Sequence, residues 1–219
     1  MISTDDLDLH QLRVLLAPAI ADVAAFDGWS ARAVAEAARV HGIDPDVAAY
    51  AFKDGAMGMI AAWIETIDLA MEVQASASLL AAMKVRDRIL RLIELRLAAV
   101  GEREEALRRA LAIMAMPQNA KRALSLGWRT ADRMWRLVGD VSTDYNHYTK
   151  RAILAGVYGA TLAVYLSDES EGKADTRAFL QRRIDGVMRF EKAKARFLRP
   201  REDGFSVARF LGRLRYPAR

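Results

Sequence analysis

The chain has 219 residues, a formal net charge of +5 and no cysteine. This length buries a full hydrophobic core without disulfides, and the lack of cysteine excludes thiol catalysis and thiolate metal sites. The charge is uneven, because the chain from Lys173 onward has 14 Lys/Arg against 5 Asp/Glu, a local net charge of +9 that leaves −4 for residues 1–172. The basic end predicts an anionic partner, either a membrane surface or nucleic acid.

The first ten residues, MISTDDLDLH, contain three aspartates and no Lys or Arg. They resemble neither a signal peptide nor a mitochondrial transit peptide, so we expect a bacterial-type, cytoplasmic form. A first helix is expected at 9–26. It contains Pro18, which removes one intrahelical hydrogen bond and predicts a kink or break there.

Two short helices are expected next, at 31–41 and 45–52, joined by a turn that contains a glycine. The residue types at their ends are those that cap helices. They are Ser30 as an N-cap, Gly42 as a C-cap, Asp44 as the next N-cap and Pro45 at the first helical position. Two short helices with such a turn form the helix-turn-helix pattern.

The residues of the second of these helices argue against DNA recognition. DNA affinity depends on Lys and Arg near phosphates, and sequence specificity depends on Arg, Lys, Asn or Gln at base edges. The segment 44–54 instead carries Asp44, Asp46 and Asp54 against a single Lys53. We therefore expect a structural use of the motif and no specific DNA binding, with a DNA-binding regulator as the alternative.

Apolar residues recur at helical spacing along the rest of the chain, and no stretch alternates with period two. These helices are expected at 55–70, 76–98, 102–115, 118–138, 143–166 and 175–198. The uncharged run 152–167 has 16 residues, fewer than the about 20 that span a membrane, and predicts a buried core helix. The predicted fold class is all-α, with a helix-turn-helix part at 1–54, a ligand-binding body at 55–170 and a basic amphipathic tail at 171–219.

Catalytic groups are scarce in this sequence. The histidines are His10, His41 and His147, and only the last lies among acids, with Asp144 three residues before it at a predicted helix start. Two such residues are fewer than a metal site needs, and an aspartate at a helix start also interacts favourably with the helix dipole. We expect no metal, no cofactor and no enzymatic activity.

Bulky and pliable apolar residues are spread over several of the expected helices. Methionine adapts to irregular ligands as well as to irregular cores, so ordinary packing and a ligand cavity both remain open. Gly156 and Gly159, three apart in the most apolar helix, indicate close approach of another helix or a cavity, because glycine costs helix stability. The bulky residues are Trp63, Trp128, Trp135, Tyr158 and Tyr165, with Met57, Met59, Met71, Met83, Met114, Met116 and Met134.

The tail helix at 175–198 is amphipathic, with an aromatic and aliphatic side opposite most of its Lys and Arg residues. This pattern is typical of a helix that lies in a membrane interface. Docking of the apolar side against the body is the alternative. The residues expected to bind the membrane are Phe179, Leu180, Ile184, Val187, Phe190 and Phe197.

The segment 127–168 resembles the lipid-binding family that contains the ninth Coq protein of ubiquinone biosynthesis. The matching features are Ala131-Asp132, Met134-Trp135, Gly139-Asp140, Ser142-Thr143-Asp144, Asn146 and Tyr148-Thr149-Lys150-Arg151-Ala152. FDGWS at 26–30 behind Pro18 and VRDRI at 85–89 also resemble that family. The resemblance therefore covers residues 9–198.

The resemblance implies a fold like that of the TetR regulators, usually dimeric and without DNA binding. It implies an accessory protein of ubiquinone biosynthesis that binds an isoprenoid quinone or another lipid and presents it to the demethoxyubiquinone hydroxylase. The basic tail predicts that this takes place at the inner face of an anionic membrane. A TetR-type ligand-responsive transcription regulator is the alternative function. The residues expected on the helices around the lipid cavity are Met83, Leu92, Trp128, Trp135, Ile153, Val157, Tyr158 and Leu162.

The resemblance also implies a partner-binding patch on the two helices that flank the turn between Gly139 and Asp144. We expect one exposed patch that engages the hydroxylase. Its residues are Asp132, Met134, Asp144, His147 and Tyr148. Better-known relatives have tryptophan where this chain has His147, which predicts a weaker patch or one fitted to a different hydroxylase.

Overall fold

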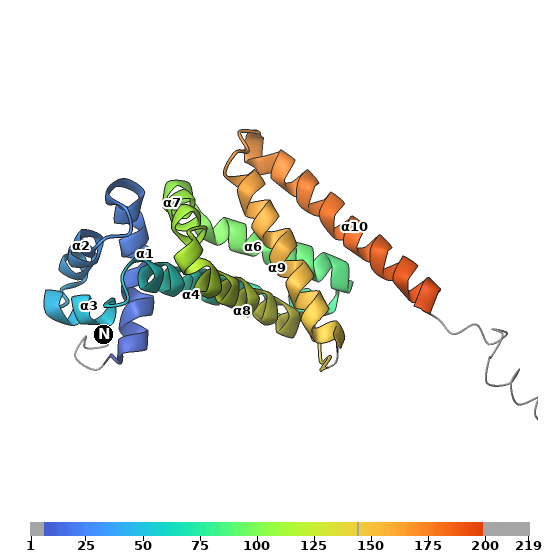
Figure 1. Ribbon diagram of the computed structural model, residues 1–219, viewed down its shortest axis with the longest axis horizontal. Helices are drawn as coiled ribbons and strands as arrows, with labels where there is room; N and C mark the ends of the chain where they lie inside the picture. Colours follow the sequence, from blue (N-terminus) through green and yellow to red (C-terminus); the bar gives the residue numbers. More distant parts are fainter. Residues whose placement is uncertain (1–6, 144, 199–219) are drawn as a thin grey trace, which may run out of the picture. The chain divides into compact units, whose positions relative to one another are not determined.

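The structure is a computed structural model that describes residues 7–143 and 145–198, with side chains as far as residue 190 (Figure 1). The described residues form α-helices and short 3-10 turns and no strand, which confirms the all-α prediction. Contacts divide the chain into two units, Met1–Ile184 and Asp185–Arg219. The predicted boundaries after residues 54 and 170 both fall inside the first unit.

The helix-turn-helix part consists of α1 (Leu9–Asp27), α2 (Ala31–His41) and α3 (Pro45–Ala51). The predicted caps are confirmed: Ser30 accepts a hydrogen bond from the backbone at the start of α2, and Asp44 does the same for α3. Gly42 ends α2 with φ at 65°, in the left-handed region that favours glycine.

The sequence predicted a kink or a break at Pro18, and the structure excludes the break, because α1 continues through this residue. Its inward residues are fully buried, among them Leu16 and Ile20, so packing holds the helix together where one hydrogen bond is missing. By length and composition α1 also meets the criteria for a membrane span. It packs against α2, α4 and α7, however, and core helices of other proteins meet the same criteria.

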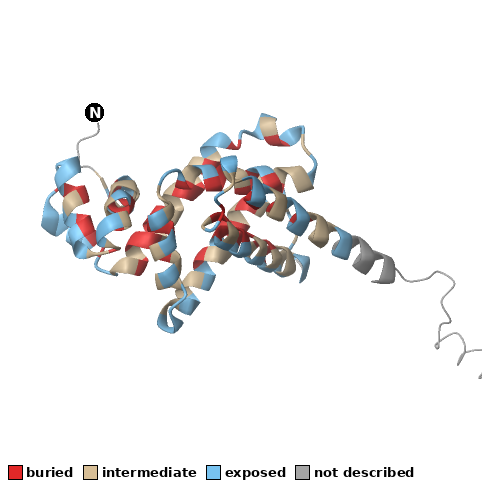
Figure 2. Cartoon of the chain, turned by 90° about the horizontal axis from the view of Figure 1, so that it is seen from above, coloured by how far each residue is buried: buried red, intermediate tan, exposed pale blue. Residues whose placement is uncertain are grey.

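The body contains α4 (Ala56–Gln74), α5 (Ala77–Ala81), α6 (Val85–Val100), α7 (Glu104–Met114), α8 (Ala120–Val138) and α9 (Tyr145–Tyr165). The α4 helix lies at the centre, since it contacts α1, α6, α7 and α8, and α8 pairs with α9. Figure 2 shows the buried residues gathered where these helices meet. Trp63 of α4, Leu92 of α6 and Met134 of α8 are almost completely buried there.

The helix predicted at 76–98 is divided into α5 and α6, a difference with an identifiable cause. Arg88 donates hydrogen bonds to the carbonyl oxygens of Ala81 and Met83, at the end of α5 and in the turn after it, and to that of Val138 at the end of α8. These bonds use carbonyl groups that a helix end leaves free. One arginine thus closes the break and ties it to α8.

The turn between α9 and α10 (Ala174–Leu198) is closed by the buried Asp168. Its carboxylate accepts hydrogen bonds from the backbone and hydroxyl groups of Ser170 and Thr176. These bonds outweigh the opposing effect of burial and hold the pKa of Asp168 well below its usual range. The start of α10 is therefore fixed to the first unit.

Candidate functional site

A groove of about 520 Å³ lies among α4, α6, α7, α8 and α9. Its volume is in the range of small-molecule sites, about 300–1,000 Å³. The exposed residues Ala152, Gly156 and Gly159 line one side, so the groove opens to the surface of α9. Most of the other lining side chains are apolar, among them Trp63, Ile64, Ile67, Val100, Leu107, Leu111, Met114, Leu126, Trp128 and Leu162.

A buried polar cluster forms part of the groove wall. Arg96 is 2% exposed, forms an ion pair with the buried Asp68, and lies over the ring of Tyr158 at 5.0 Å. Thr130 donates a second hydrogen bond to Asp68. Because Asp68 and Arg96 neutralise each other, the wall presents an aromatic ring and little net charge to a bound molecule.

Of the eight residues expected around a lipid cavity, Trp128, Tyr158 and Leu162 line the groove. The other five do not line it: four lie on α6, α8 and α9, and Met83 lies in the turn before α6. Leu92 is part of the closed core, Trp135 donates a hydrogen bond to the carbonyl of Lys150, and Met83, Ile153 and Val157 are half-buried elsewhere. That lipid fills the groove remains a prediction.

Several lining residues were not in the predicted set, notably Ile67, Val100, Leu107 and Leu111. They lie on α4, α6 and α7, outside the segment whose motif carries the family resemblance. For the open side of the groove the sequence did contain a signal, the two glycines of α9. Nothing lies within 4 Å of the position where a Cβ would stand on Gly156 or Gly159, so the two glycines leave space rather than admit a neighbouring helix.

A second candidate site is the turn between α8 and α9, which charged groups hold in place. Arg151 is 2% exposed and donates hydrogen bonds to Asp132 at 2.6 Å, to Asp140 at 3.1 Å and to the carbonyl of His147 at 3.1 Å. Lys150 forms a further ion pair with Asp140 at 2.7 Å. We call these four charged residues, Asp132, Asp140, Lys150 and Arg151, the turn clamp.

Asp140 remains ionised in this setting. Burial favours the neutral acid, but hydrogen bonds from Lys150, Ser142 and Arg151 outweigh it and lower the pKa of Asp140 to about 2. Asp140 is therefore charged at neutral pH, and its ion pairs with Lys150 and Arg151 fix the direction in which α9 leaves the turn.

The five residues expected in the partner-binding patch differ in exposure. Tyr148 is 62% exposed, whereas Asp132 and His147 are half-buried. Met134 is fully buried on the inward stripe of α8 and therefore does not contribute to an exposed patch. Asp144 lies outside the described residues. Two neighbours that the motif did not single out are more exposed than Tyr148, namely Val141 at 90% and Tyr145 at 74%.

An aromatic cluster connects this turn with the groove. The ring of Tyr148 lies 6.0 Å from that of Trp128 and 5.1 Å from that of His147, and His147 lies 6.4 Å from Trp128. His147 is oriented by donating a hydrogen bond from Nδ1 to the carbonyl of Ser142. Trp128 thus belongs to both sites, since it lines the groove and packs beneath Tyr148.

The residues expected to bind a membrane fall on both sides of the boundary between the two units. Leu180 and Ile184 are buried within the first unit, so they are not available to a bilayer in this structure. Phe179 and Val187 are half-buried and Phe190 is 61% exposed. The side chain of Phe197 lies outside the described residues.

The outer face of α3 carries an acidic residue, as the sequence indicated, together with exposed apolar residues. Val47 is 47% exposed and Tyr50 is 58% exposed, with the ammonium of Lys53 over the Tyr50 ring at 4.9 Å. Asp46 is also exposed. These side chains offer DNA phosphates one cation, and that cation already contacts an aromatic ring.

The family model described as COQ9 matches residues 120–191. The ubiquinone biosynthesis protein COQ9, mitochondrial, of Rattus norvegicus is 35% identical over 167 residues, which cover 74% of this chain and 54% of the rat protein. The Homo sapiens protein of the same name is 34% identical, with 74% and 52% covered. The chain spans about half the length of these relatives.

The crystal structure of the TetR transcriptional regulator from Nitrosomonas europaea ATCC 19718 is similar in fold, with a TM-score of 0.64. The match covers 81% of this chain and 98% of that one at 20% sequence identity. At this low identity the structural match is evidence for the fold alone. The match confirms the TetR-like architecture.

Proposed function

We propose, from its similarity to the COQ9 family, that this chain is a non-enzymatic accessory protein of ubiquinone biosynthesis that binds isoprenoid quinone intermediates. The groove among α4, α6, α7, α8 and α9 is the observation that carries the proposal. Burial of apolar surface contributes about 25 cal/mol per Å², so a chain that buries several hundred Å² gains roughly 10 kcal/mol before the costs of binding.

The exposed side of the α8–α9 turn is proposed to engage the demethoxyubiquinone hydroxylase. Tyr148, Tyr145 and Val141 supply exposed apolar surface there, and aromatic residues often dominate interface energetics. Because Trp128 contacts Tyr148 and also lines the groove, a ligand in the groove lies next to the proposed partner surface. The ligand can then pass from the groove to the bound hydroxylase without being released into water.

The basic tail is proposed to hold the protein peripherally at the inner, cytoplasmic face of an anionic membrane. Near such a surface each Lys or Arg contributes about 1 kcal/mol, and Phe190 adds an exposed aromatic side chain. A homodimer is proposed as the working form, as the family resemblance implies. In this scheme the membrane supplies the water-insoluble quinone precursor, and the dimer carries two grooves.

The lipid proposal is tested by filling the groove from its open side. Nothing lies within 4 Å of the position of a Cβ on Gly159, so Gly159→Trp can extend its ring into the groove, and replacing a helical glycine leaves helix stability equal or higher. We expect the purified variant to carry at least about fivefold less co-purified lipid, measured by organic extraction and mass spectrometry.

The matched control is Ala160→Trp, an exposed residue of the same helix that does not line the groove. It should retain the lipid content of the parent protein. Equal lipid content in the two variants would overturn the assignment of the groove, provided that circular dichroism shows both to be folded.

A further inference from the structure

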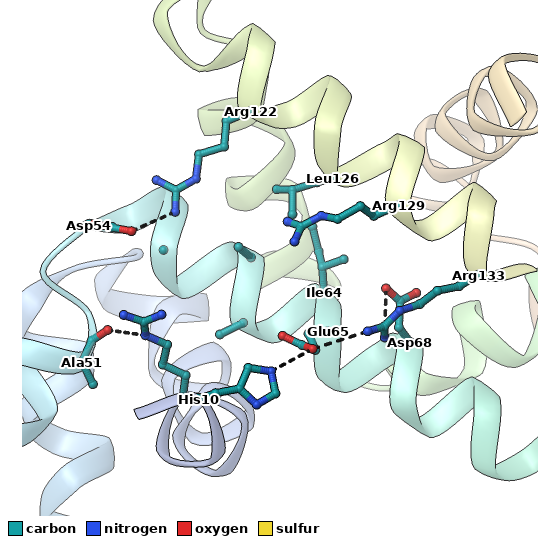
Figure 3. Close-up of a pocket in the computed structure, with 14 residues that line it drawn as sticks. His10, Ala51, Asp54, Ile64, Glu65, Asp68, Arg122, Leu126, Arg129 and Arg133 are labelled. Atoms are coloured by element: carbon teal, nitrogen blue, oxygen red, sulfur yellow. Dashed lines mark hydrogen bonds and ion pairs between the residues drawn. The ribbon is translucent and has the colours of Figure 1, made fainter. Parts of the chain in front are cut away.

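A second, smaller pocket of about 270 Å³ lies where α1 and the α3–α4 loop face α4 and α8 (Figure 3). Small residues line part of it, including Ala51, Ala61 and Ala62. Gly58 is also part of it, and a Cβ there would lie 3.0 Å from Cβ of Asp54 and 3.9 Å from Nη2 of Arg122. The space therefore depends on a glycine in the first turn of a helix, where most side chains would crowd it.

Arginine side chains line one side of this pocket at helical spacing. Arg122, Arg129 and Arg133 lie on one face of α8, and Figure 3 shows all three extending toward α4. Arg13 of α1 also lines the pocket. Four guanidinium groups thus line a space too small for a long isoprenoid chain.

The guanidinium groups have hydrogen-bond donors to spare. Arg13 donates through Nε to the carbonyl of Ala51, and Arg122 forms one bond to Asp54 at 3.3 Å. Arg133 is held loosely by three carboxylates at 3.4–3.8 Å, and its buried Nη1 has no hydrogen-bond partner. For Arg129 no hydrogen bond or ion pair is formed with any described residue. Each guanidinium carries five N–H groups, so most are free to bind an added acceptor.

Two of the guanidinium charges in the pocket have no carboxylate partner. The carboxylate of Glu65 accepts a hydrogen bond from His10, Asp68 is neutralised by Arg96, and Asp54 pairs with Arg122. Arg13 and Arg129 line the pocket and form no ion pair with any described residue, an excess of two positive charges. An ion-pair network that served only to join α1 to α8 would not need Arg129.

We propose that this pocket binds a small dianion of the phosphate or diphosphate class. Guanidinium groups bind phosphate oxygens with paired, charge-assisted hydrogen bonds, and the volume suits such a group. Ile64 and Leu126 line both this pocket and the groove, so the two spaces adjoin at these side chains. The dianion is either a free anion or the headgroup of a lipid whose tail passes these side chains into the groove.

The test is isothermal titration calorimetry of the full chain with sodium pyrophosphate and with inorganic phosphate, at neutral pH and fixed ionic strength. We expect saturable binding of one pyrophosphate per chain, and about tenfold weaker binding in Arg129→Gln, because one charged donor pair is lost. Arg32→Gln is the control, since it removes the same charge from an exposed position on α2 outside the pocket.

The control should bind within about twofold of the parent protein. Absence of saturable binding by the parent at millimolar anion overturns the proposal, as does an equal loss in the two variants. Because Arg129 has no partner among the described residues, its replacement should leave the circular dichroism and melting temperature unchanged. Arg122→Gln is a second variant and should weaken binding in the same direction.

Farnesyl diphosphate distinguishes the two sources of the dianion. Binding about tenfold tighter than pyrophosphate, with the Arg129→Gln effect retained, assigns the site to a lipid headgroup. Equal affinities assign it to a free anion, and both results support the site. This arm alone depends on the proposed lipid groove: Gly159→Trp should abolish the advantage of farnesyl diphosphate while pyrophosphate binding persists. Loss of both ligands in Arg129→Gln with normal lipid content would leave the groove proposal intact.

Discussion

Arg151 joins the two helices at the turn where the partner surface is expected. It is almost fully buried and bonds carboxylates on α8 and in the turn, so loss of either carboxylate leaves part of its charge unpaired in the interior. Removing one member of a buried ion pair is strongly destabilising, because the other member stays desolvated. The turn clamp therefore sets both the stability of this region and the direction of Tyr148.

Asp140→Asn should lower the free energy of unfolding by about 2–3 kcal/mol at pH 7, as measured by urea denaturation. The amide keeps the shape of the carboxyl group but loses its ion pairs with Lys150 and Arg151. Asp46→Asn is the control, an exposed aspartate on α3, and should change stability by less than about 0.5 kcal/mol.

The carboxylate of Asp140 also makes the stability of the protein depend on pH. Its pKa of about 2 in the folded protein lies below the usual value of 3.8, so its stabilising effect is complete above about pH 4 and is lost as the pH falls toward 2. Linkage gives about 2 kcal/mol for this loss. The difference in stability between the parent and Asp140→Asn should therefore shrink between pH 4 and pH 2, and a constant difference would contradict the assignment.

Tyr148→Ala should weaken binding of the demethoxyubiquinone hydroxylase by about 1–3 kcal/mol, since an exposed aromatic side chain at the centre of a surface is a common hot spot. Surface plasmon resonance with the purified hydroxylase measures the change. Tyr50→Ala provides the comparison, because Tyr50 has similar exposure on α3. If the two variants bind the hydroxylase equally well, Tyr148 is not part of the interface.

At the scale of elements, α8 serves several sites through different faces. Arg122, Arg129 and Arg133 line the smaller pocket, here called the arginine pocket, Trp128 lines the groove, and Asp132 belongs to the turn clamp. The buried stripe of the same helix, which includes Met134, packs into the core. Because one rigid helix carries all of these residues, their relative positions are set by helical geometry rather than by loops.

The boundary between the two units falls within α10, after Ile184, and this affects the choice of a truncated chain for testing membrane binding. Leu180 and Ile184 are buried within the first unit, so a chain truncated before them would lose core packing as well as the tail. A chain ending at Ile184 keeps both residues. It should lose flotation with liposomes that contain acidic phospholipid, whereas the full chain should float at low salt and be released at high salt.

The lipid composition supplies the control for this experiment. Neither chain should float with liposomes of purely zwitterionic phospholipid, because the electrostatic attraction is then missing. Equal flotation of the two chains on acidic liposomes would show that the anchor lies before residue 185. Binding that does not respond to salt would indicate a hydrophobic anchor instead.

At the scale of the whole molecule, a regulator-like fold carries a surface unsuited to DNA. The α3 face should give no sequence-selective binding in gel shifts at physiological salt, because its acidic residues repel phosphates and its exposed Val47 and Tyr50 do not read base edges. A salt series separates this outcome from weak, nonspecific attraction by the basic tail. Nanomolar, sequence-selective binding would favour the transcription regulator instead.

The sequence alone determined the helices, because helix formation depends on local signals. Ser30, Gly42, Asp44 and Pro45 marked the limits of α2 and α3 to within a residue, since caps act on backbone groups of their own turn. The motif around Asp140 and Arg151 also indicated the family from residues close together in the chain. The division of the helix near Arg88 was missed, because the carbonyl of Val138 that the arginine also binds lies 50 residues away.

Only the tertiary structure decided which faces of these helices are open. Leu92 and Leu162 look alike in sequence, yet the first lies in the closed core and the second lines a groove. Met134 was expected at the surface and is buried, because α8 turns that stripe toward the core. Periodicity shows that a helix has a buried side but not what covers it, and the arginine pocket gathers residues from α1 and α8 that lie more than a hundred positions apart.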